Sequence, residues 1–315
     1  MERRLDIVCM GEPMLEFTRV MDDEGRSVFM QGFGGDTSNC AIAAARQGAK
    51  VGYVTALGTD RFGDLYMDLW KDEGIDVSAV ARDPDAPTGI YFIEPMAEGR
   101  DFTYYRKGSA ASRMSPDSLH SEPLSRTRIL LISAISQAIS ESACKAVSRA
   151  IEIARNAGAL IAYDTNLRLN LWDLEVARRV IHETARIADI VMPSIDEARV
   201  LTGLDEVDRI VDFYCGFEPR ILALKCGADG AVLAADGQVE AIPPIAVQVV
   251  DTSGAGDTFC GAFLARLATG DDPFDAGRHA VTAAGLSTTG YGAVNPIPRA
   301  SDVNAAMIQF DSREG

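Results

Sequence analysis

Short runs of consecutive apolar residues recur along the chain, and stretches with helical periodicity separate them. The first run covers Leu5–Met10, and others lie at 51–57, 129–132, 160–163, 190–192 and 221–224. Helix-spaced apolar positions follow several of them, most clearly over 140–157 and 173–187. Apolar strands that alternate with helices are typical of a mostly parallel sheet covered on both faces. The pattern therefore predicts a doubly wound α/β fold.

Further elements are expected at both ends of this pattern. A helix is predicted from the capping residues Asp36 to Asn39 as far as Gly48, and the pair Gly34-Gly35 precedes it. Near the C-terminus, an alternating stretch over 231–243 completes the strands, and a final apolar helix is expected over 276–287.

Two segments depart from the strand–helix rhythm. Residues 14–33 are charged, with alternating pieces on either side of Glu24-Gly25, and residues 88–94 and 101–106 are rich in β-branched and aromatic side chains. Residues 14–33 predict one hairpin, and residues 88–94 together with 101–106 predict a second one. Together they predict a small separate sheet, formed by about 14–33 and 86–107, that could act as a lid. No linker marks a second autonomous unit, so residues 1–315 are expected to form one domain.

The stretch with the most chemistry is Asp251-Thr-Ser-Gly-Ala-Gly-Asp257. Its glycines allow a tight turn, and an apolar, helix-spaced run follows directly. Free amides at a helix N-terminus favour a bound anion. Asp257 in the first turn would be repelled by a phosphate, which favours a role as a base for a hydroxyl group. The chain has no Gly-x-x-x-x-Gly-Lys-Ser/Thr motif and no Gly-x-Gly-x-x-Gly at a strand–helix junction.

Charge and cysteine content narrow the class of protein. The 30 Lys and Arg residues against 46 Asp and Glu give a net charge of −16, which disfavours binding to nucleic acid or to an anionic membrane surface. No segment approaches ~20 uninterrupted apolar residues, as a membrane-spanning helix requires. The six cysteines are scattered, with no Cys-x-x-Cys pair. They favour reduced thiols and a cytoplasmic location.

Four other clusters have both a structural and a functional interpretation. Residues 104–110 join aromatic and basic side chains, either as a solvated edge strand or as part of a site. In 164–172, Asp164, Asn166 and Arg168 alternate and would point to one side if extended; the arginine suits a substrate carboxylate, or it pairs with a neighbouring Asp. Residues 225–230 fit either a plain β-turn or a turn that contacts a nucleotide. Residues 194–197 fit either a helix cap or a helix on which Glu197 faces a metal ion.

The motif at 251–259 resembles the C-terminal signature of ribokinase-like sugar kinases of the phosphofructokinase-B type. Residues 34–39, 41–48 and 57–63 resemble the N-terminal part of the same pattern, so the resemblance covers nearly the whole chain. Within the family, residues 104–110 and 164–172 are similar to 2-keto-3-deoxygluconate kinases. The resemblance implies a ribokinase-like fold and ATP-dependent, Mg²⁺-requiring phosphorylation of a primary 6-hydroxyl.

The resemblance also implies roles for individual residues. Asp257 would be the base, and the turn of Gly254, Ala255 and Gly256 would stabilise the transferring phosphoryl group. The sugar acid would contact Gly35, Asn39, Tyr91, Tyr104, Arg106 and Arg168, with the two arginines on its carboxylate. The nucleotide, bound within about 190–295, would contact Asn166, Ser194, Lys225, Gly227, Gly230, Gly254 and Gly256. Glu197 would reach Mg²⁺ through water. The family commonly has Asn where this chain has Ser194, which puts a direct role of that position in doubt.

Several alternatives stay open. A fructokinase or another neutral-sugar kinase would need the same base but no carboxylate-binding arginine, and a nucleoside kinase would leave both arginines surplus. A sugar-acid sensor without catalysis is disfavoured by the intact motif from Gly254 to Asp257. An exposed lid hairpin favours a homo-oligomer of undefined subunit number.

Overall fold

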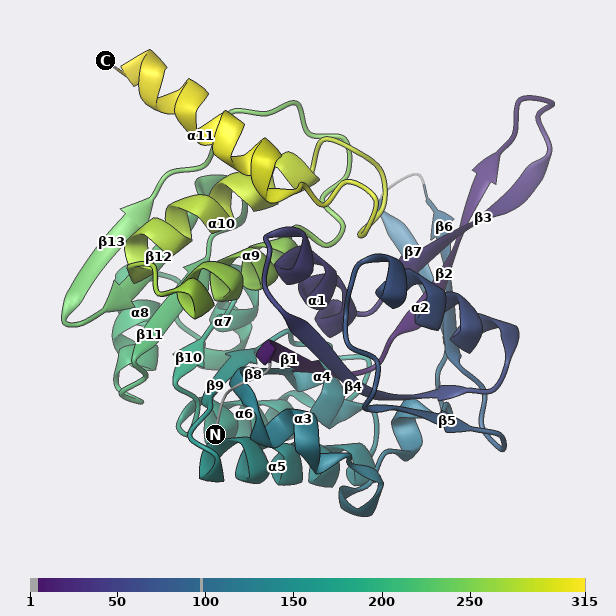
Figure 1. Ribbon diagram of the computed structural model, residues 1–315. Coiled ribbons are helices and arrows are strands. Elements are labelled where there is room, and N and C mark those ends of the chain that lie inside the picture. The colour runs from purple at the N-terminus through teal and green to yellow at the C-terminus, as the bar shows by residue number, and fades with distance from the viewer. Residues whose placement is uncertain (1–4, 97–98, 315) are drawn as a thin grey trace.

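The larger of two sheets forms the centre of the computed structural model, which describes residues 5–96 and 99–314 (Figure 1). Within these residues it has nine strands in the order β13-β12-β11-β10-β9-β8-β1-β4-β5. All neighbours from β11 to β5 are parallel, whereas β12 and β13 are antiparallel. The predicted mostly parallel sheet is thus confirmed. The strand bounds are β1 Leu5–Met10, β4 Val51–Gly58, β5 Val80–Asp83, β8 Thr127–Ser133, β9 Leu160–Asp164, β10 Ile190–Val191, β11 Ile221–Lys225, β12 Ala231–Ala235 and β13 Gln238–Ile242.

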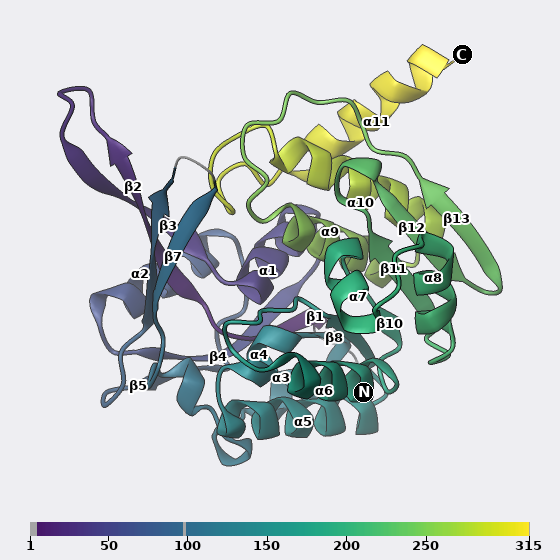
Figure 2. The same ribbon diagram turned by 180° about the vertical axis from the view of Figure 1, so that it is seen from behind.

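Helices cover both faces of this sheet, as the two opposite views show (Figures 1 and 2). One face carries α1 Asp36–Arg46, α2 Arg61–Asp72, α9 Ala255–Thr269, α10 Pro273–Ser287 and α11 Ala300–Glu314. The other carries α3 Ser121–Ser125, α4 Ala134–Ala138, α5 Glu141–Asn156, α6 Leu174–Ala185, α7 Ile195–Thr202 and α8 Val207–Cys215. Short 3₁₀ turns lie at Ala111–Arg113, Pro116–Ser118 and Gly227–Asp229. Among the described helices, none combines the length and the apolar character needed to cross a membrane.

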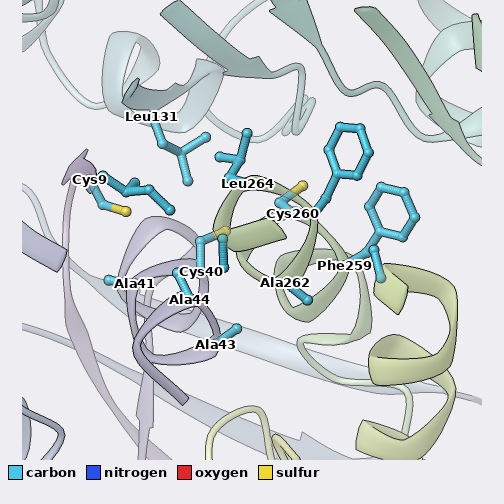
Figure 3. Packing of buried hydrophobic residues seen from close by; sticks show 14 of the residues in the cluster. Cys9, Cys40, Ala41, Ala43, Ala44, Leu131, Phe259, Cys260, Ala262 and Leu264 are labelled. Atoms are coloured by element: carbon cyan, nitrogen blue, oxygen red, sulfur yellow. The ribbon is translucent and has the colours of Figure 1, made fainter. Parts of the chain in front are cut away.

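The helices α1 and α9 pack against each other unusually closely, through small side chains (Figure 3). A Cβ built on Gly261 would lie 2.2 Å from the carbonyl oxygen of Cys40 and 2.6 Å from Cβ of Ala43. The two backbones therefore approach to a distance that only glycine at position 261 permits. This contact sets the position of the first turn of α9 relative to the first turn of α1.

The smaller sheet is formed by the two predicted hairpins. Its strands are β2 Met14–Met21, β3 Ser27–Gly34, β6 Gly89–Pro95 and β7 Arg100–Tyr105, in the order β3-β2-β6-β7. Parallel pairing of β2 with β6 joins the hairpins, and the β2–β3 hairpin projects from the body of the molecule (Figure 1). Because only residues 11–13 separate β1 from β2, this sheet adjoins the carboxyl edge of the main sheet, where α/β folds bind ligands.

Three details of the sequence prediction were wrong. The helix expected to be the last one is α10, and α11 follows it. The alternating stretch 231–243 is a hairpin of two strands, which turns where Asp236 and Gly237 adopt φ of 49° and 75°. The cap of α1 is Gly35, with φ of 102°, while Asp36 belongs to the buried first turn. The helix starts at Asp36 as predicted, but the capping position is taken by Gly35, whose positive φ suits glycine.

Candidate active site

A cavity of about 220 Å³ lies between the carboxyl edge of the main sheet and the small sheet. It gathers residues from opposite ends of the sequence, including all of the predicted sugar-site residues. Its lining consists of Glu12, Met14, Glu16, Gly35, Asp36, Asn39, Tyr91, Ile93, Phe102, Tyr104, Arg106, Ile135, Asn166, Arg168, Asn170, Ser253, Gly254, Asp257 and Ala293. The polar side chains surround a space suited to one small molecule.

Asp257 lies on the cavity wall in the first turn of α9. Its Oδ2 accepts a hydrogen bond of 2.8 Å from Nδ2 of Asn39 on α1. Burial and the nearby carboxylate of Asp36 raise the pKa of Asp257 to about 7, and the hydrogen bond from Asn39 opposes this shift. A carboxylate whose pKa lies close to neutrality is well suited to act as a general base.

The turn in front of Asp257 has the geometry of an anion site. Gly254, with φ of 72°, precedes α9, and no side chain caps the helix. The Ala255 amide donates to the carbonyl oxygen of Thr252 at 3.2 Å, whereas the described residues offer the Gly256 amide no hydrogen-bond partner. The free amide at the helix N-terminus would favour a negatively charged group beside the carboxylate of Asp257.

Arg106 reaches the cavity wall from the end of β7 and is held by a carboxylate that the sequence analysis did not identify. Nε and Nη2 of Arg106 donate to Oε2 of Glu12, with 2.8 Å for Nε, and Oε1 of Glu12 accepts from the Ser109 hydroxyl at 2.8 Å. Burial raises the pKa of Glu12, although the charge of Arg106 opposes this shift. The charge of Arg106 is therefore largely neutralised within the protein.

Arg168 is the less constrained of the two arginines. Its Nη1 donates to the carbonyl oxygen of Leu167 at 2.8 Å and lies 3.4 Å from Oε1 of Glu197. About half of its side chain, 47%, is exposed. The partner is thus a glutamate from α7 and not a neighbouring Asp. Because the contact with Glu197 is long and the guanidinium borders the cavity, Arg168 keeps donors available for a ligand.

Aromatic rings of the small sheet form one wall of the cavity. The rings of Tyr91, Phe102 and Tyr104 pack against one another, with centroids 5.6 Å apart for Tyr91 and Tyr104, 6.2 Å for Phe102 and Tyr104, and 6.4 Å for Tyr91 and Phe102. The Tyr91 hydroxyl donates to Oε2 of Glu16 at 2.6 Å. Glu16 and Phe102 were not among the predicted site residues. Their strands alternate between the two faces of a thin sheet, so the sequence alone does not tell which face meets the ligand.

The residues that follow β9 do not share one direction, contrary to the expectation for an extended segment. Asp164 accepts a hydrogen bond of 2.8 Å from Nζ of Lys225, and Nδ2 of Asn166 donates to Oδ2 of Asp36 at 3.1 Å. Asn166 and Arg168 line the cavity, whereas Asp164 is not among its lining residues. The strand ends at Asp164, and the alternation of side chains ends with it.

Comparison with known proteins agrees with this arrangement. The model of the pfkB family of carbohydrate kinases matches residues 4–300. The chain belongs to the pfkB family. It is 33% identical over 310 residues to 2-dehydro-3-deoxygluconokinase from Thermoproteus tenax, covering 96% of this chain and 94% of that protein. It is 34% identical over 312 residues to fructokinase-1 from Zea mays, covering 94% and 96%.

A solved relative shows the same fold. The crystal structure of a Xylella fastidiosa fructokinase with bound ATP matches with a TM-score of 0.88 and 24% identity, covering 97% of this chain and 99% of that one. The fold is therefore ribokinase-like, as predicted, and membership of the family makes this pfkB protein a phosphotransferase with an alcohol acceptor.

Of the predicted nucleotide residues, Asn166 and Gly254 line the same cavity as the sugar-site candidates, whereas Lys225, Gly227 and Gly230 lie outside it. The side chain of Lys225 is 12% exposed and lies against the start of α9, where it binds Asp164 and contacts Sγ of Cys260 at 3.4 Å. Although burial opposes its charge, the Asp164 carboxylate raises the pKa of Lys225. Gly227 and Gly230 flank the exposed turn after β11, with φ of 60° and 85°. None of these three residues lines the 220 Å³ cavity.

Ser194 and Glu197 belong to the first turn of α7. The Ser194 hydroxyl caps this helix by accepting from the Glu197 amide at 3.4 Å, which is the capping arrangement left open by the sequence. Glu197 lines a wider groove of about 740 Å³ beside the cavity, and burial raises its pKa. Among the described residues there is no cluster of three or more His, Cys, Asp or Glu side chains able to hold a metal ion.

Proposed function

We propose that this pfkB protein transfers a phosphoryl group from ATP to the primary 6-hydroxyl of 2-keto-3-deoxygluconate. One observation supports the proposal: Asp257, Gly254 at the N-terminus of α9, Arg106 and Arg168 all line one cavity. Asp257 would accept the hydroxyl proton, and the Gly256 amide would stabilise charge on the transferring phosphoryl group.

The residues present fit a nucleoside triphosphate beside this cavity. The uncapped start of α9 offers an amide to an anion, and Lys225 lies against the same turn, where a Cβ on Gly256 would be 3.8 Å from Nζ. ATP is bound in the Xylella fastidiosa fructokinase of the same fold. Asn166, Ser194, Gly227, Gly230 and Gly254 remain the proposed nucleotide contacts.

The carboxylate of Glu197 also suits a magnesium ion that is held partly by water molecules. Glu197 lies near Asp164 and Lys225, whose charges act on its pKa, and its Oε2 accepts from the Thr165 hydroxyl at 3.1 Å. Oxygen ligands and bound water are what Mg²⁺ prefers, and the ion would neutralise phosphate charge when present. We include Mg²⁺ and a water-mediated role of Glu197 in the proposal.

The choice of a sugar acid rests on Arg168. Glu12 already holds Arg106, whereas the ionic contact that Arg168 makes within the described residues, with Glu197, is long, and Arg168 lines the cavity. A substrate carboxylate would give this guanidinium a better partner and would restrain the aromatic wall above it. The similar identities to a 2-dehydro-3-deoxygluconokinase and a fructokinase, 33% and 34%, do not favour either substrate.

A neutral-sugar kinase is the second candidate, and the pairing of Arg106 with Glu12 supports it. Glu16 on the cavity wall would accept hydrogen bonds from the hydroxyl groups of either kind of sugar. A coupled ADP-release assay with MgATP separates the candidates, using 2-keto-3-deoxygluconate, its galactonate epimer, fructose, ribose and adenosine. Preference for the keto acids is the expected result. Preference for fructose or ribose would overturn the substrate assignment, and bound keto acid without ATP turnover would indicate a sensor.

The small sheet also supports a proposed homo-oligomer. Its β2–β3 hairpin exposes the large apolar side chains of Met21, Val28, Phe29 and Met30. Exposed apolar groups on a projecting hairpin favour contact with a second copy. Light scattering after size-exclusion chromatography should give a mass above 33.8 kDa, whereas a monomer at micromolar concentration would contradict this proposal.

A further inference from the structure

Arg46, the last residue of α1, lies outside the cavity but binds a segment that borders it. Its side chain is only 12% exposed. Nε and Nη2 donate to the carboxylate of Glu73, which follows α2, over distances of 2.6 to 3.2 Å. Glu73 is itself 9% exposed. The buried carboxylate therefore fixes the plane of the guanidinium group.

The remaining terminal nitrogen of Arg46 faces a group of main-chain oxygens. Nη1 donates to the carbonyl of Ile297 at 2.7 Å and to that of Val294 at 2.9 Å, with Asn295 further away at 3.4 Å. The side chains of Val294 and Ile297 are buried in the core. Charge-assisted hydrogen bonds of this kind are stronger than neutral ones, so Arg46 restrains the whole segment 294–297.

The same segment packs directly on the turn that precedes α9. A Cβ on Gly254 would lie 2.8 Å from the carbonyl oxygen of Ala293, and the Gly292 amide donates to Oδ2 of Asp251 at 3.0 Å. Ala293 also lines the cavity. A displacement of 292–297 would therefore change the packing that supports the Gly254 turn.

Both ends of α1 consequently act on the start of α9. At its N-terminal end Asn39 donates to Asp257, and at its C-terminal end Arg46 holds the segment that packs on Gly254. We propose that Arg46, fixed by Glu73, is a positioning residue for phosphoryl transfer, because it keeps the 254–256 turn aligned with Asp257. This inference rests on the proposed anion-binding role of that turn.

Substitution of Arg46 tests the inference. Arg46→Met should lower kcat about 30- to 100-fold, since small misplacement of a reacting group has effects of this size, while KM for the sugar should change less than about threefold. Arg46→Lys keeps the positive charge but not the planar guanidinium group, so its kcat should fall less than that of Arg46→Met. Guanidinium ion at millimolar concentration should restore part of the kcat of Arg46→Gly. A purely structural role would not produce rescue with an unchanged sugar KM.

Arg128→Met is the matched control. Arg128 also joins a carboxylate, that of Asp6, to a main-chain carbonyl, that of Ala268, but it does so at the amino ends of the strands. Its substitution should leave kcat within about twofold. If Arg46→Met proves insoluble, Arg46→Lys and Glu73→Gln are judged by the same criteria.

Two outcomes overturn the inference: a kcat of folded Arg46→Met within threefold of that of the unsubstituted enzyme, or a loss in Arg46→Gly that guanidinium does not restore. Asp257→Asn separates this failure from failure of the proposed function. If Asp257→Asn retains turnover, the proposed catalytic site is wrong. If it abolishes turnover while Arg46→Met does not, only the role of Arg46 is wrong.

Discussion

Nδ2 of Asn39 donates a 2.8 Å hydrogen bond to Oδ2 of Asp257, and this contact joins the first turns of two helices that are 218 positions apart in the sequence. It opposes the effects of burial and of Asp36, which together raise the pKa of Asp257 to about 7. The reactivity of the proposed base therefore depends on a balance between one amide donor and one nearby carboxylate.

The pH dependence of catalysis should follow this balance. A base must be deprotonated to act, so kcat/KM should increase tenfold per pH unit below about 7 and reach a plateau above it. Asn39→Ala removes the donor that lowers the pKa and should move the midpoint to higher pH. Asp36→Asn removes the charge that raises it and should move the midpoint lower. Initial rates at subsaturating sugar between pH 5 and 9 measure both shifts, and unchanged midpoints would exclude Asp257 as the titrating group.

The same pKa predicts that Asp257 limits the stability of the fold. The carboxyl titrates at 3.8 when unperturbed and at about 7 in the folded protein, so its contribution to stability is lost as pH increases through this range. Asp257→Asn should therefore be more stable than the unsubstituted protein at pH 8, by about 2 kcal/mol, and the gain should shrink as pH falls towards 4. This is below the ~4 kcal/mol of a fully buried shift, because Asp257 lines the cavity and is only partly buried. Urea unfolding at pH 8 and pH 5 measures this gain in the free energy of unfolding. An equal gain at both pH values would contradict the prediction.

Arg168 should affect keto acids and neutral sugars differently. Arg168→Ala is expected to lower kcat/KM for 2-keto-3-deoxygluconate about 10- to 100-fold through loss of a charge-assisted contact, and to change kcat/KM for fructose less than about threefold. Arg149→Ala is the control, since Arg149 pairs with Glu152 on the exposed side of α5. Equal losses for both sugars would assign Arg168 to the fold or to its contact with Glu197 rather than to the carboxylate.

Local patterns allowed much of the fold to be predicted. The strands from β1 to β11 in the main sheet are apolar because helices cover both faces, and this produces uninterrupted runs such as Leu5–Met10. The exception is β5, which is only partly buried and carries Arg82 and Asp83; it was not predicted. The helix α11 was also missed because it has few apolar positions. Among its described side chains, that of Val303 is fully buried.

The base and its turn could be predicted because their residues are contiguous, whereas the ionic partners of the site could not. Glu12 and Arg106 are 94 positions apart, and the pairing of Glu12 with Ser109 spans 97. Contacts of this kind depend on how β1 meets the small sheet, which no local pattern contains. The one available signal was an acidic residue directly after the first apolar strand, a position where α/β folds place functional groups.

The contact between α1 and α9 gives a final prediction about how the core supports the site. Gly261→Val places a side chain where a Cβ alone would be 2.2 Å from the carbonyl oxygen of Cys40, so the helices must separate. Overpacking should cost about 1–3 kcal/mol in urea unfolding. Because the same separation would lengthen the contact of Asn39 with Asp257, kcat should also fall and the midpoint of the pH profile should rise. Gly216→Ala is the control, since its Cβ would meet nothing closer than 3.2 Å. A destabilised Gly261→Val enzyme with an unchanged pH profile would show that the base does not depend on this helix contact.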